Sequence, residues 1–242
     1  MAKTGLTPLM ISAFVGMTAC GSAGTGGSSG PFGSETEDVV AECDVVVVNE
    51  TSIERHVTIY QDHVGVGSGH DVLSLAWKTV ALQPGQEFQF KWTENYSFNW
   101  SSAALPAGAS YSVSGTADAG TATSNEIILA DTSSGAVFEE PTDGPEANEL
   151  VIDVETANAQ FVGIGLGGAP LYVTPAAENT EYLFDVSDPE YFLFVGAQSN
   201  AGQVVDADVF DARVSFTKDI GTVLKATIIE SGLDPQVTLT ID

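Results

Sequence analysis

Aromatic residues that could hold a ligand are concentrated between Ser74 and Trp100. Trp77, Trp92, Tyr96 and Trp100 carry flat apolar rings with a polar edge, and such rings can stack on sugars or on other flat ligands. The same rings are equally suited to packing in a core, which is the more common role of large aromatic residues. The sequence therefore marks these four as candidate ligand-binding residues and leaves core packing as the alternative.

Acidic residues near the C-terminus form a second set with possible chemistry. Asp206, Asp208 and Asp211 lie within the segment DADVFDA, and Asp185 and Asp188 lie within DVSDP. Calcium accepts six to eight oxygen ligands, which acidic loops often supply. The spacing does not match an EF-hand loop, so a solvated acidic loop competes with a Ca²⁺ site built on the first three residues.

Other reactive residue types lack a supporting pattern. His56, His63 and His70 recur at intervals of seven, but no closely spaced histidine pair that would favour a metal site is present. Nucleophile motifs of the GxSxG kind are absent, and no organic cofactor motif is convincing. The run GIGLGG at 163–168 precedes APLYVTP, which does not start a helix, so we predict a glycine-rich turn or bulge. No catalytic residue is assigned, and an enzymatic activity is left open but not expected.

Residues 1–20 have the layout of an export signal. Lys3 precedes an apolar run from Leu9 to Met17, which is too short to span a bilayer, and small residues lead to Cys20. The tail MTAC is similar to a bacterial lipobox and predicts lipidation at Cys20. Because Gly21 follows, we expect a lipid-anchored protein of the bacterial outer membrane or cell surface, with simple secretion as the alternative.

Residues 21–42 are rich in glycine and serine and then acidic, which predicts a flexible tether. The whole chain holds 33 acidic residues against 7 lysines and arginines, for a net charge of −26. Such a surface repels nucleic acids, so partners are expected to be a membrane, through the anchor, and a glycan or protein ligand. Cys43 is expected to be a buried apolar residue.

The elements that would position these residues are strands. Between Phe88 and Trp100, aromatic residues alternate with polar ones, which indicates strands with one buried face. One interpretation is a single long strand. The other, which removes Glu94 from the core, is a hairpin with the loop Thr93-Glu94-Asn95, in which Trp92 lies opposite Tyr96.

Short apolar runs continue at close spacing to the C-terminus, without a convincing helical period. They indicate a β-sandwich or a barrel, and of these we predict an all-β sandwich with β-rich halves at 43–140 and 150–242 joined by a linker at 141–149. The halves can be aligned: VVVVNETSIERHVTIY beside ELVIDVETANAQFVGIG, and EFQFKWTENYSFNW beside EYLFDVSDPEYFLFVG. Duplication and a mere shared period both explain this alignment.

Several stretches carry a resemblance: SLAWKTVALQPGQEFQFKWTENYSFNWS, NEIIL, GIGLGGAPLYV and YFLFVG. Through them, most of residues 44–242 resembles the rhizosphere-induced protein RhiA family of bacteria. The resemblance implies no enzymatic activity and transfers no functional residue. The chain differs from the family in its signal-like start, its tether and its acidity. The expected function is a non-enzymatic, surface-anchored binding protein; the alternative is a carbohydrate-binding or carbohydrate-active module that uses exposed aromatic residues.

Overall fold

The described residues contain strands and no helix, which confirms the predicted all-β class. The structure is a computed structural model that describes residues 42–61, 71–205, 210–217, 223–231 and 234–241. These residues belong to one compact unit spanning Glu35–Asp242. Across the described ranges, no helix could cross a membrane. The predicted signal at 1–20, Cys20 and nearly all of the tether at 21–42 lie outside the described residues.

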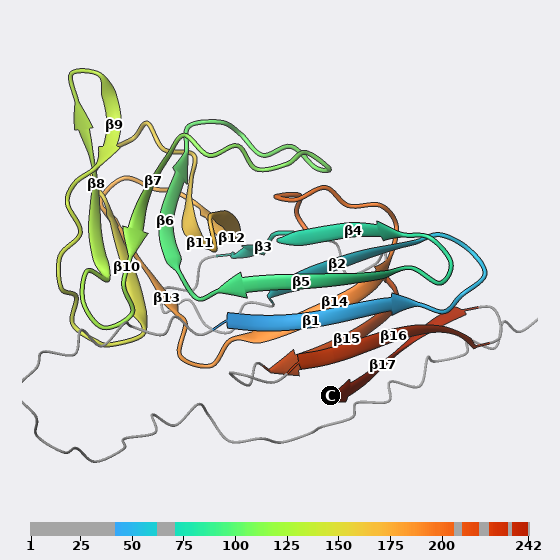
Figure 1. Ribbon diagram of the computed structural model, residues 1–242. Coiled ribbons are helices and arrows are strands. Elements are labelled where there is room, and N and C mark those ends of the chain that lie inside the picture. Colours follow the sequence, from blue (N-terminus) through green and yellow to red (C-terminus); the bar gives the residue numbers. More distant parts are fainter. Residues whose placement is uncertain (1–41, 62–70, 206–209, 218–222, 232–233, 242) are drawn as a thin grey trace, which may run out of the picture. The chain divides into compact units, whose positions relative to one another are not determined.

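Seventeen strands make up the described fold (Figure 1). In chain order they are β1 (Glu42–Asn49), β2 (Arg55–Gln61), β3 (Leu73–Ser74), β4 (Lys78–Leu82), β5 (Glu87–Thr93), β6 (Tyr96–Ser101), β7 (Gly115–Ala119), β8 (Glu126–Thr132), β9 (Gly135–Phe138), β10 (Glu149–Val154), β11 (Phe161–Leu166), β12 (Ala169–Pro175), β13 (Thr180–Asp185), β14 (Glu190–Gly196), β15 (Phe210–Thr217), β16 (Val223–Ser231) and β17 (Asp234–Ile241).

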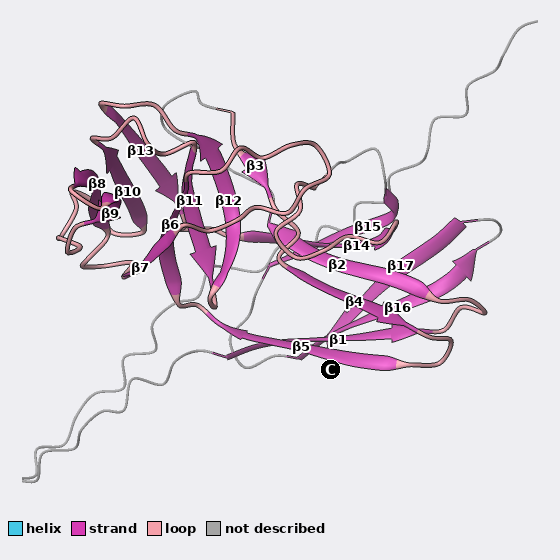
Figure 2. Cartoon of the chain, turned by 90° about the horizontal axis from the view of Figure 1, so that it is seen from above, coloured by secondary structure: helices cyan, strands magenta, loops and turns pink. Residues whose placement is uncertain are grey.

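The strands form four sheets that pack as two sandwiches (Figures 1 and 2). In the first sandwich, the sheet β17-β16-β1-β5 faces the sheet β15-β14-β2-β4, with β15 near β17 and β4 near β5. In the second, the sheet β13-β10-β8-β9 faces the sheet β3-β12-β11-β6-β7. Buried side chains from both sandwiches belong to one large hydrophobic cluster. The β-sandwich prediction is therefore confirmed, in a doubled form.

The two sandwiches share one pairing scheme. The sheet β17-β16-β1-β5 corresponds strand by strand to the sheet β9-β8-β10-β13, and each contains a single parallel pair. The sheet β4-β2-β14-β15 corresponds in the same way to β12-β11-β6-β7, and β3 is an extra strand at the edge of the latter sheet. The register agrees as well. Ile59 on β2 lies opposite Leu193 on β14, and the equivalent Ile164 on β11 lies opposite the equivalent Phe98 on β6. The aligned sequence repeats correspond to these equivalent strands, which favours duplication.

Both sequence halves contribute to each sandwich. The first sandwich combines β1, β2, β4 and β5 with β14–β17, whereas the second consists of β6–β13 together with β3. The two halves are therefore interleaved, because each contributes strands to both sandwiches.

The junction at 141–149 is held by hydrogen bonds. Thr142 exchanges two backbone bonds with Glu126, and the Asn125 side chain bonds Gly144, Glu146 and Glu149.

The aromatic stretch forms neither the predicted hairpin nor a single strand, so both interpretations were wrong. Strand β5 pairs with β1, and Phe90 lies opposite Val45; strand β6 pairs with β11, and Phe98 lies opposite Ile164. The chain passes from the first sandwich to the second through Glu94. The alternation itself is correct, because the even-numbered rings from Phe90 to Trp100 are buried. Alternation reports the buried face of a strand but not its partner.

The glycine-rich run at 163–168 forms the predicted turn and bulge. The register of β11 against β12 shifts between Ile164 and Gly165. Gly167 and Gly168 then turn the chain with φ values of 57° and 80°, a left-handed conformation that glycine adopts without a steric penalty. The run therefore serves the β-hairpin and does not form a dinucleotide loop.

Candidate functional site

Three of the four candidate aromatic residues lie together in the core. Trp77, Trp92 and Tyr96 are 2%, 5% and 5% exposed. The rings of Trp77 and Trp92 meet edge to face at 5.2 Å, and Trp92 lies 5.3 Å from the ring of Tyr191. Tyr191 in turn stacks on Phe216. These ring contacts of the two tryptophans and the burial of all three residues agree with the core alternative.

The polar edges of this aromatic cluster are bonded inside the protein. Trp77 Nε1 donates to the carbonyl oxygen of Leu166 at 2.8 Å, and Trp92 Nε1 donates to the Tyr191 hydroxyl at 3.4 Å. Burial, and then the neighbouring Tyr191 and Glu94, raise the pKa of Tyr96 well above its ordinary value. Burial likewise raises the pKa of Tyr191. Both phenols are therefore neutral in the folded protein at physiological pH, as a structural core requires.

The fourth candidate, Trp100, lies elsewhere, beside a groove between strands β7 and β9. The groove encloses about 720 Å³. Its lining includes both apolar and acidic residues: Trp100, Ser114, Gly115, Thr116, Ala117, Asp118, Ala136, Val137, Phe138, Glu139, Glu140 and Pro141. Trp100 is 8% exposed, so it contributes a limited part of its ring to this surface.

Small residues on β7 create the space. A Cβ atom added at Gly115 would lie 2.4 Å from Nε1 of Trp100, so only glycine lets the indole lie across this strand. Ala117 and Ala119 follow at alternate positions on the same face, opposite Phe98 and Tyr96. None of the three carries a side chain larger than a methyl group.

The other sandwich has larger side chains at the equivalent positions. Val214 lies opposite Leu193, as Ala117 lies opposite Phe98; Phe216 lies opposite Tyr191, as Ala119 lies opposite Tyr96. There, β15 and β17 lie close to each other, and Phe216 is buried and stacks on Tyr191. In addition, β9 ends at Phe138, whereas β17 continues to Ile241, well past the equivalent Val237. One sandwich is closed at this end, and the other keeps a groove.

The groove is acidic. Asp118 lies on β7, and Glu139 and Glu140 directly follow β9; all three are exposed. Within the described ranges, the ion pairs are those of Lys91 with Asp44 and of His56 with Glu54, neither of which involves the groove. The uncompensated negative charge therefore favours a ligand with positive charge.

Hydrogen-bonding groups of the backbone also face the groove. The backbone N–H of Gly167 donates to the carbonyl of Asn95, next to β6. Successive residues of a strand direct their backbone groups to opposite sides. In β6, the odd-numbered residues therefore bond β11 and the even-numbered residues bond β7. This ladder directs the N–H and C=O groups of Thr116 and Asp118 away from β6. In the described structure β7 has a neighbour on one side only, so these groups lie on a free sheet edge.

The remaining candidates do not form a site among the described residues. Asp206 and Asp208 lie outside them, as do His63 and His70, and Asp211 is exposed on β15. Among the described residues, no group of three or more histidine, cysteine or acidic residues could hold a metal ion.

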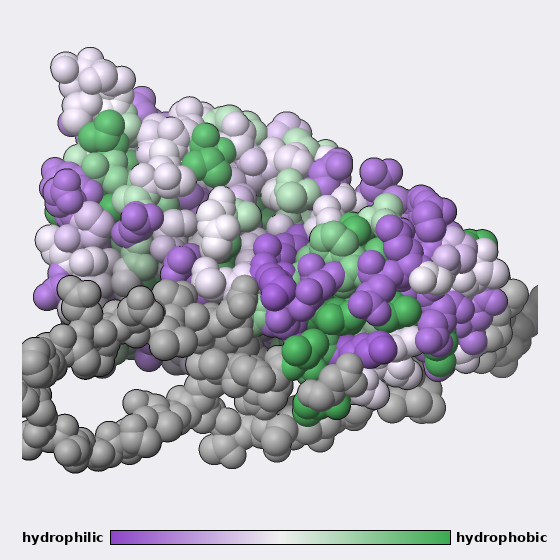
Figure 3. All heavy atoms as spheres, viewed as in Figure 1, coloured by the Kyte–Doolittle hydropathy of each residue, from purple (hydrophilic) through white to green (hydrophobic). Residues whose placement is uncertain are grey.

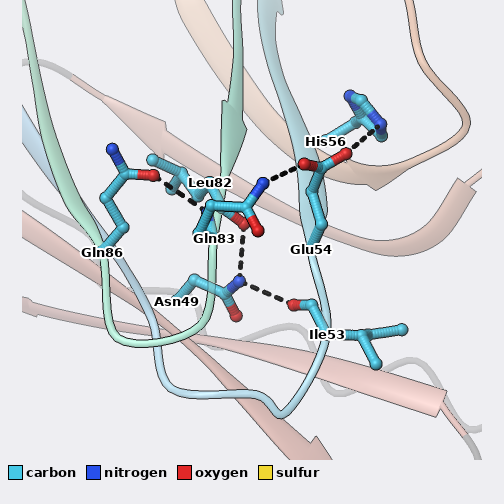
Figure 4. Close-up of polar contacts among 7 residues, drawn as sticks. All are labelled: Asn49, Ile53, Glu54, His56, Leu82, Gln83 and Gln86. Atoms are coloured by element: carbon cyan, nitrogen blue, oxygen red, sulfur yellow. Dashed lines mark hydrogen bonds and ion pairs between the residues drawn. The ribbon is translucent and has the colours of Figure 1, made fainter.

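His56 and Cys43 both have structural surroundings. His56 Nε2 lies 3.3 Å from Glu54, and Glu54 also contacts the side chain of Gln83 (Figure 4). Cys43 is buried on β1 opposite Trp92, as expected of an apolar residue.

The sequence alone did not single out the groove. Its only local signal is the run GTADA of β7, in which glycine and alanine alternate with polar residues. That pattern becomes informative only beside the run ARVSF of β15, and the equivalence of the two strands follows from the pairing of the sheets.

These features define an all-β protein with a duplicated sandwich, closed at one end by large side chains and open in the equivalent place as an acidic groove. The chain belongs to the RhiA family, whose sequence model matches residues 41–237. This confirms the resemblance seen in the sequence. Neither a curated protein nor a solved structure matches the chain.

Proposed function

We propose that this RhiA-family protein is an exported, lipid-anchored protein of the bacterial surface that acts by binding a ligand in the groove between β7 and β9. The observation that carries the proposal is the difference between the sandwiches. Ala117 and Ala119 leave open a space that Val214 and Phe216 fill in the equivalent place. The same fold closes this end in one sandwich and leaves it open in the other, and the open end has space for a ligand.

The groove composition supports recognition. Its lining combines the apolar Val137, Phe138 and Trp100 with three carboxylates and a free strand edge, and it contains no histidine, cysteine or lysine. A concave, partly apolar surface with a few polar groups is typical of binding sites. Because Trp77, Trp92 and Tyr96 are buried, they cannot form a broad stacking platform for sugars. Of the four candidate rings, Trp100 alone lines the groove.

The N-terminal sequence supports the proposed location. The apolar run before Cys20 and the Gly/Ser-rich tether at 21–42 suit a lipid anchor that holds a folded domain away from a membrane. Cys20→Ser tests this in a bacterial host with radiolabelled fatty acid. The expected result is loss of the label and of the membrane-bound form. An unlabelled wild-type chain would contradict the anchor.

The binding role can be tested on intact cells with a photo-crosslinking amino acid at Val137, which is exposed and belongs to the groove lining. The control places the same amino acid at the exposed Ile53, away from the groove lining. We expect a recurring adduct at position 137 that disappears when Ala117→Val and Ala119→Phe are added. Equal adducts at both positions would contradict the groove as the contact site.

A further inference from the structure

We propose that the ligand of this groove is an extended, basic polypeptide segment that adds to the sheet as a new strand beside β7. This inference rests on the proposed function and specifies its ligand. It follows from three independent features of the groove: a free strand edge, a base of small residues and uncompensated negative charge.

The free edge determines the geometry of the ligand. Thr116 and Asp118 present backbone N–H and C=O groups away from β6, and these groups repeat every second residue as in any strand edge. An extended peptide satisfies such an edge with its own backbone, whatever its sequence, and this is the usual basis of recognition by strand addition. A compact small molecule or a sugar would not match a row of alternating donors and acceptors.

Side-chain space determines the pattern of the ligand. In an added strand, side chains would point alternately to the two faces of the sheet that contains β7. On the inner face they would meet Ala117, Ala119 and Trp100, which leave room for apolar side chains. On the outer face they would lie beside Asp118, where a basic side chain forms a favourable cross-strand pair. The ligand is therefore expected to alternate apolar and basic residues.

Charge separates this ligand from a second copy of the same chain. Glu139 and Glu140 border the groove together with Asp118, and the chain carries a net charge of −26. Like charges disfavour pairing of two copies through this edge, whereas a basic segment is attracted to it. Exposed strand edges invite pairing, and charged residues at such an edge are one means by which proteins discourage self-association.

The test uses the full-length protein and two short fluorescent peptides, one alternating lysine and valine and one alternating glutamate and valine. Fluorescence anisotropy should show saturable binding of the lysine peptide, weakened by added salt, and no binding of the glutamate peptide. A lysine–valine peptide with methylated backbone nitrogens keeps its charge but lacks the donors for strand pairing, and it should bind at least tenfold more weakly.

Two variants locate the binding. The double variant Ala117→Val/Ala119→Phe copies the closed sandwich and should reduce affinity at least tenfold. Because larger side chains could disturb folding, Glu139→Gln/Glu140→Gln provides a second, exposed change, which should weaken binding severalfold. Its matched control, Glu146→Gln/Glu181→Gln, changes two exposed carboxylates outside the groove lining and should leave affinity unchanged.

Several results would overturn the inference. Equal binding of the N-methylated peptide would exclude strand addition, and equal effects of the two Glu→Gln pairs would place binding outside the groove. A wild-type dimer in sedimentation that the groove-filling variant dissociates would identify a second copy as the occupant. Failure of the peptides while the crosslink at Val137 persists would reject the basic segment and leave the proposed function standing.

Discussion

Ala119 and Phe216 occupy equivalent positions in the two sandwiches, opposite Tyr96 and Tyr191, and only Phe216 fills the space that follows. Phe216 stacks on Tyr191 with ring centroids 5.6 Å apart and nearly parallel planes. Ala119 has no ring to place against Tyr96. Together with Ala117 in place of Val214 and the shorter β9, this difference in side-chain size separates a closed end of a sandwich from a groove.

Phe216→Ala should destabilise the protein, because it opens the closed sandwich and removes a buried ring. Replacing a core phenylalanine by alanine typically costs about 3–5 kcal/mol, and we expect a value near the lower limit at this edge position. Chemical denaturation followed by circular dichroism measures the loss. Phe88→Ala is the control, since Phe88 is 41% exposed and should lose much less. Equal losses for the two variants would contradict the closed packing of Phe216.

Asn49→Ala should also reduce stability. The buried Asn49 side chain donates to the carbonyl oxygens of Ile53 and Leu82 at 2.9 and 2.8 Å (Figure 4). It also accepts a hydrogen bond from the Thr51 hydroxyl. Removing it leaves buried backbone carbonyls without these donors, which costs about 1–3 kcal/mol in the free energy of unfolding. Asn200→Ala, at an exposed position, should change stability by less than about 0.5 kcal/mol. An unaltered Asn49→Ala protein would show that the network is not stabilising.

Gly115→Ala should displace the indole of Trp100. The added methyl group would lie 2.4 Å from Nε1, closer than non-bonded atoms can approach, so the ring must move toward the groove. Overpacking of this kind typically costs about 1–3 kcal/mol. Acrylamide quenching of tryptophan fluorescence should increase, because Trp77 and Trp92 stay buried while Trp100 becomes accessible. Thr116→Ala, on the outer face of β7, serves as the control and should leave quenching as in the wild type.

Alkaline pH should unfold the protein together with ionisation of its buried tyrosines. Burial raises the pKa of Tyr96, Tyr111 and Tyr191 above the ordinary value of about 10 that they regain on unfolding. Their contribution to stability is therefore complete below about pH 10 and is lost as pH rises toward the pKa values of the folded state. Tyrosinate absorbance from these residues should appear only as the β signal in circular dichroism disappears. Ionisation near pH 10 with the fold intact would contradict their burial.

Large apolar side chains are rarely exposed in the described structure. Hydrophilic residues cover much of the face drawn in Figure 3, interrupted by separate hydrophobic patches. The few exposed large apolar residues of the described structure are Ile53, Phe88, Val113, Val137 and Ile241. Of these, Val137 belongs to the groove lining, which is consistent with a contact surface at that place.

The sequence predicted what depends on neighbouring residues. Alternation identified the strands of the aromatic stretch, and the run at 163–168 identified a turn, because the two-residue period and the φ requirement of glycine are local properties. Partners of strands were not predictable in the same way. Strand β5 could have paired with β6 as well as with β1, since the backbone groups of every strand are identical.

The candidate site was predicted least well. A tryptophan in a strand looks the same whether it is buried like Trp92 or borders a groove like Trp100, because burial depends on the residues that fold over it. The groove depends on what is missing at Ala117 and Ala119. Absence of a large side chain becomes a signal only when the equivalent strand of the other sandwich is known.

The central claim is that the edge of β7 receives the ligand as an added strand. Amide hydrogen exchange, followed residue by residue by NMR with and without the lysine–valine peptide, tests it directly. The account predicts new protection at Thr116 and Asp118, whose N–H groups face the groove, and little change at Ala117, which already bonds β6. Saturating peptide that leaves the exchange of Thr116 and Asp118 unchanged would contradict it.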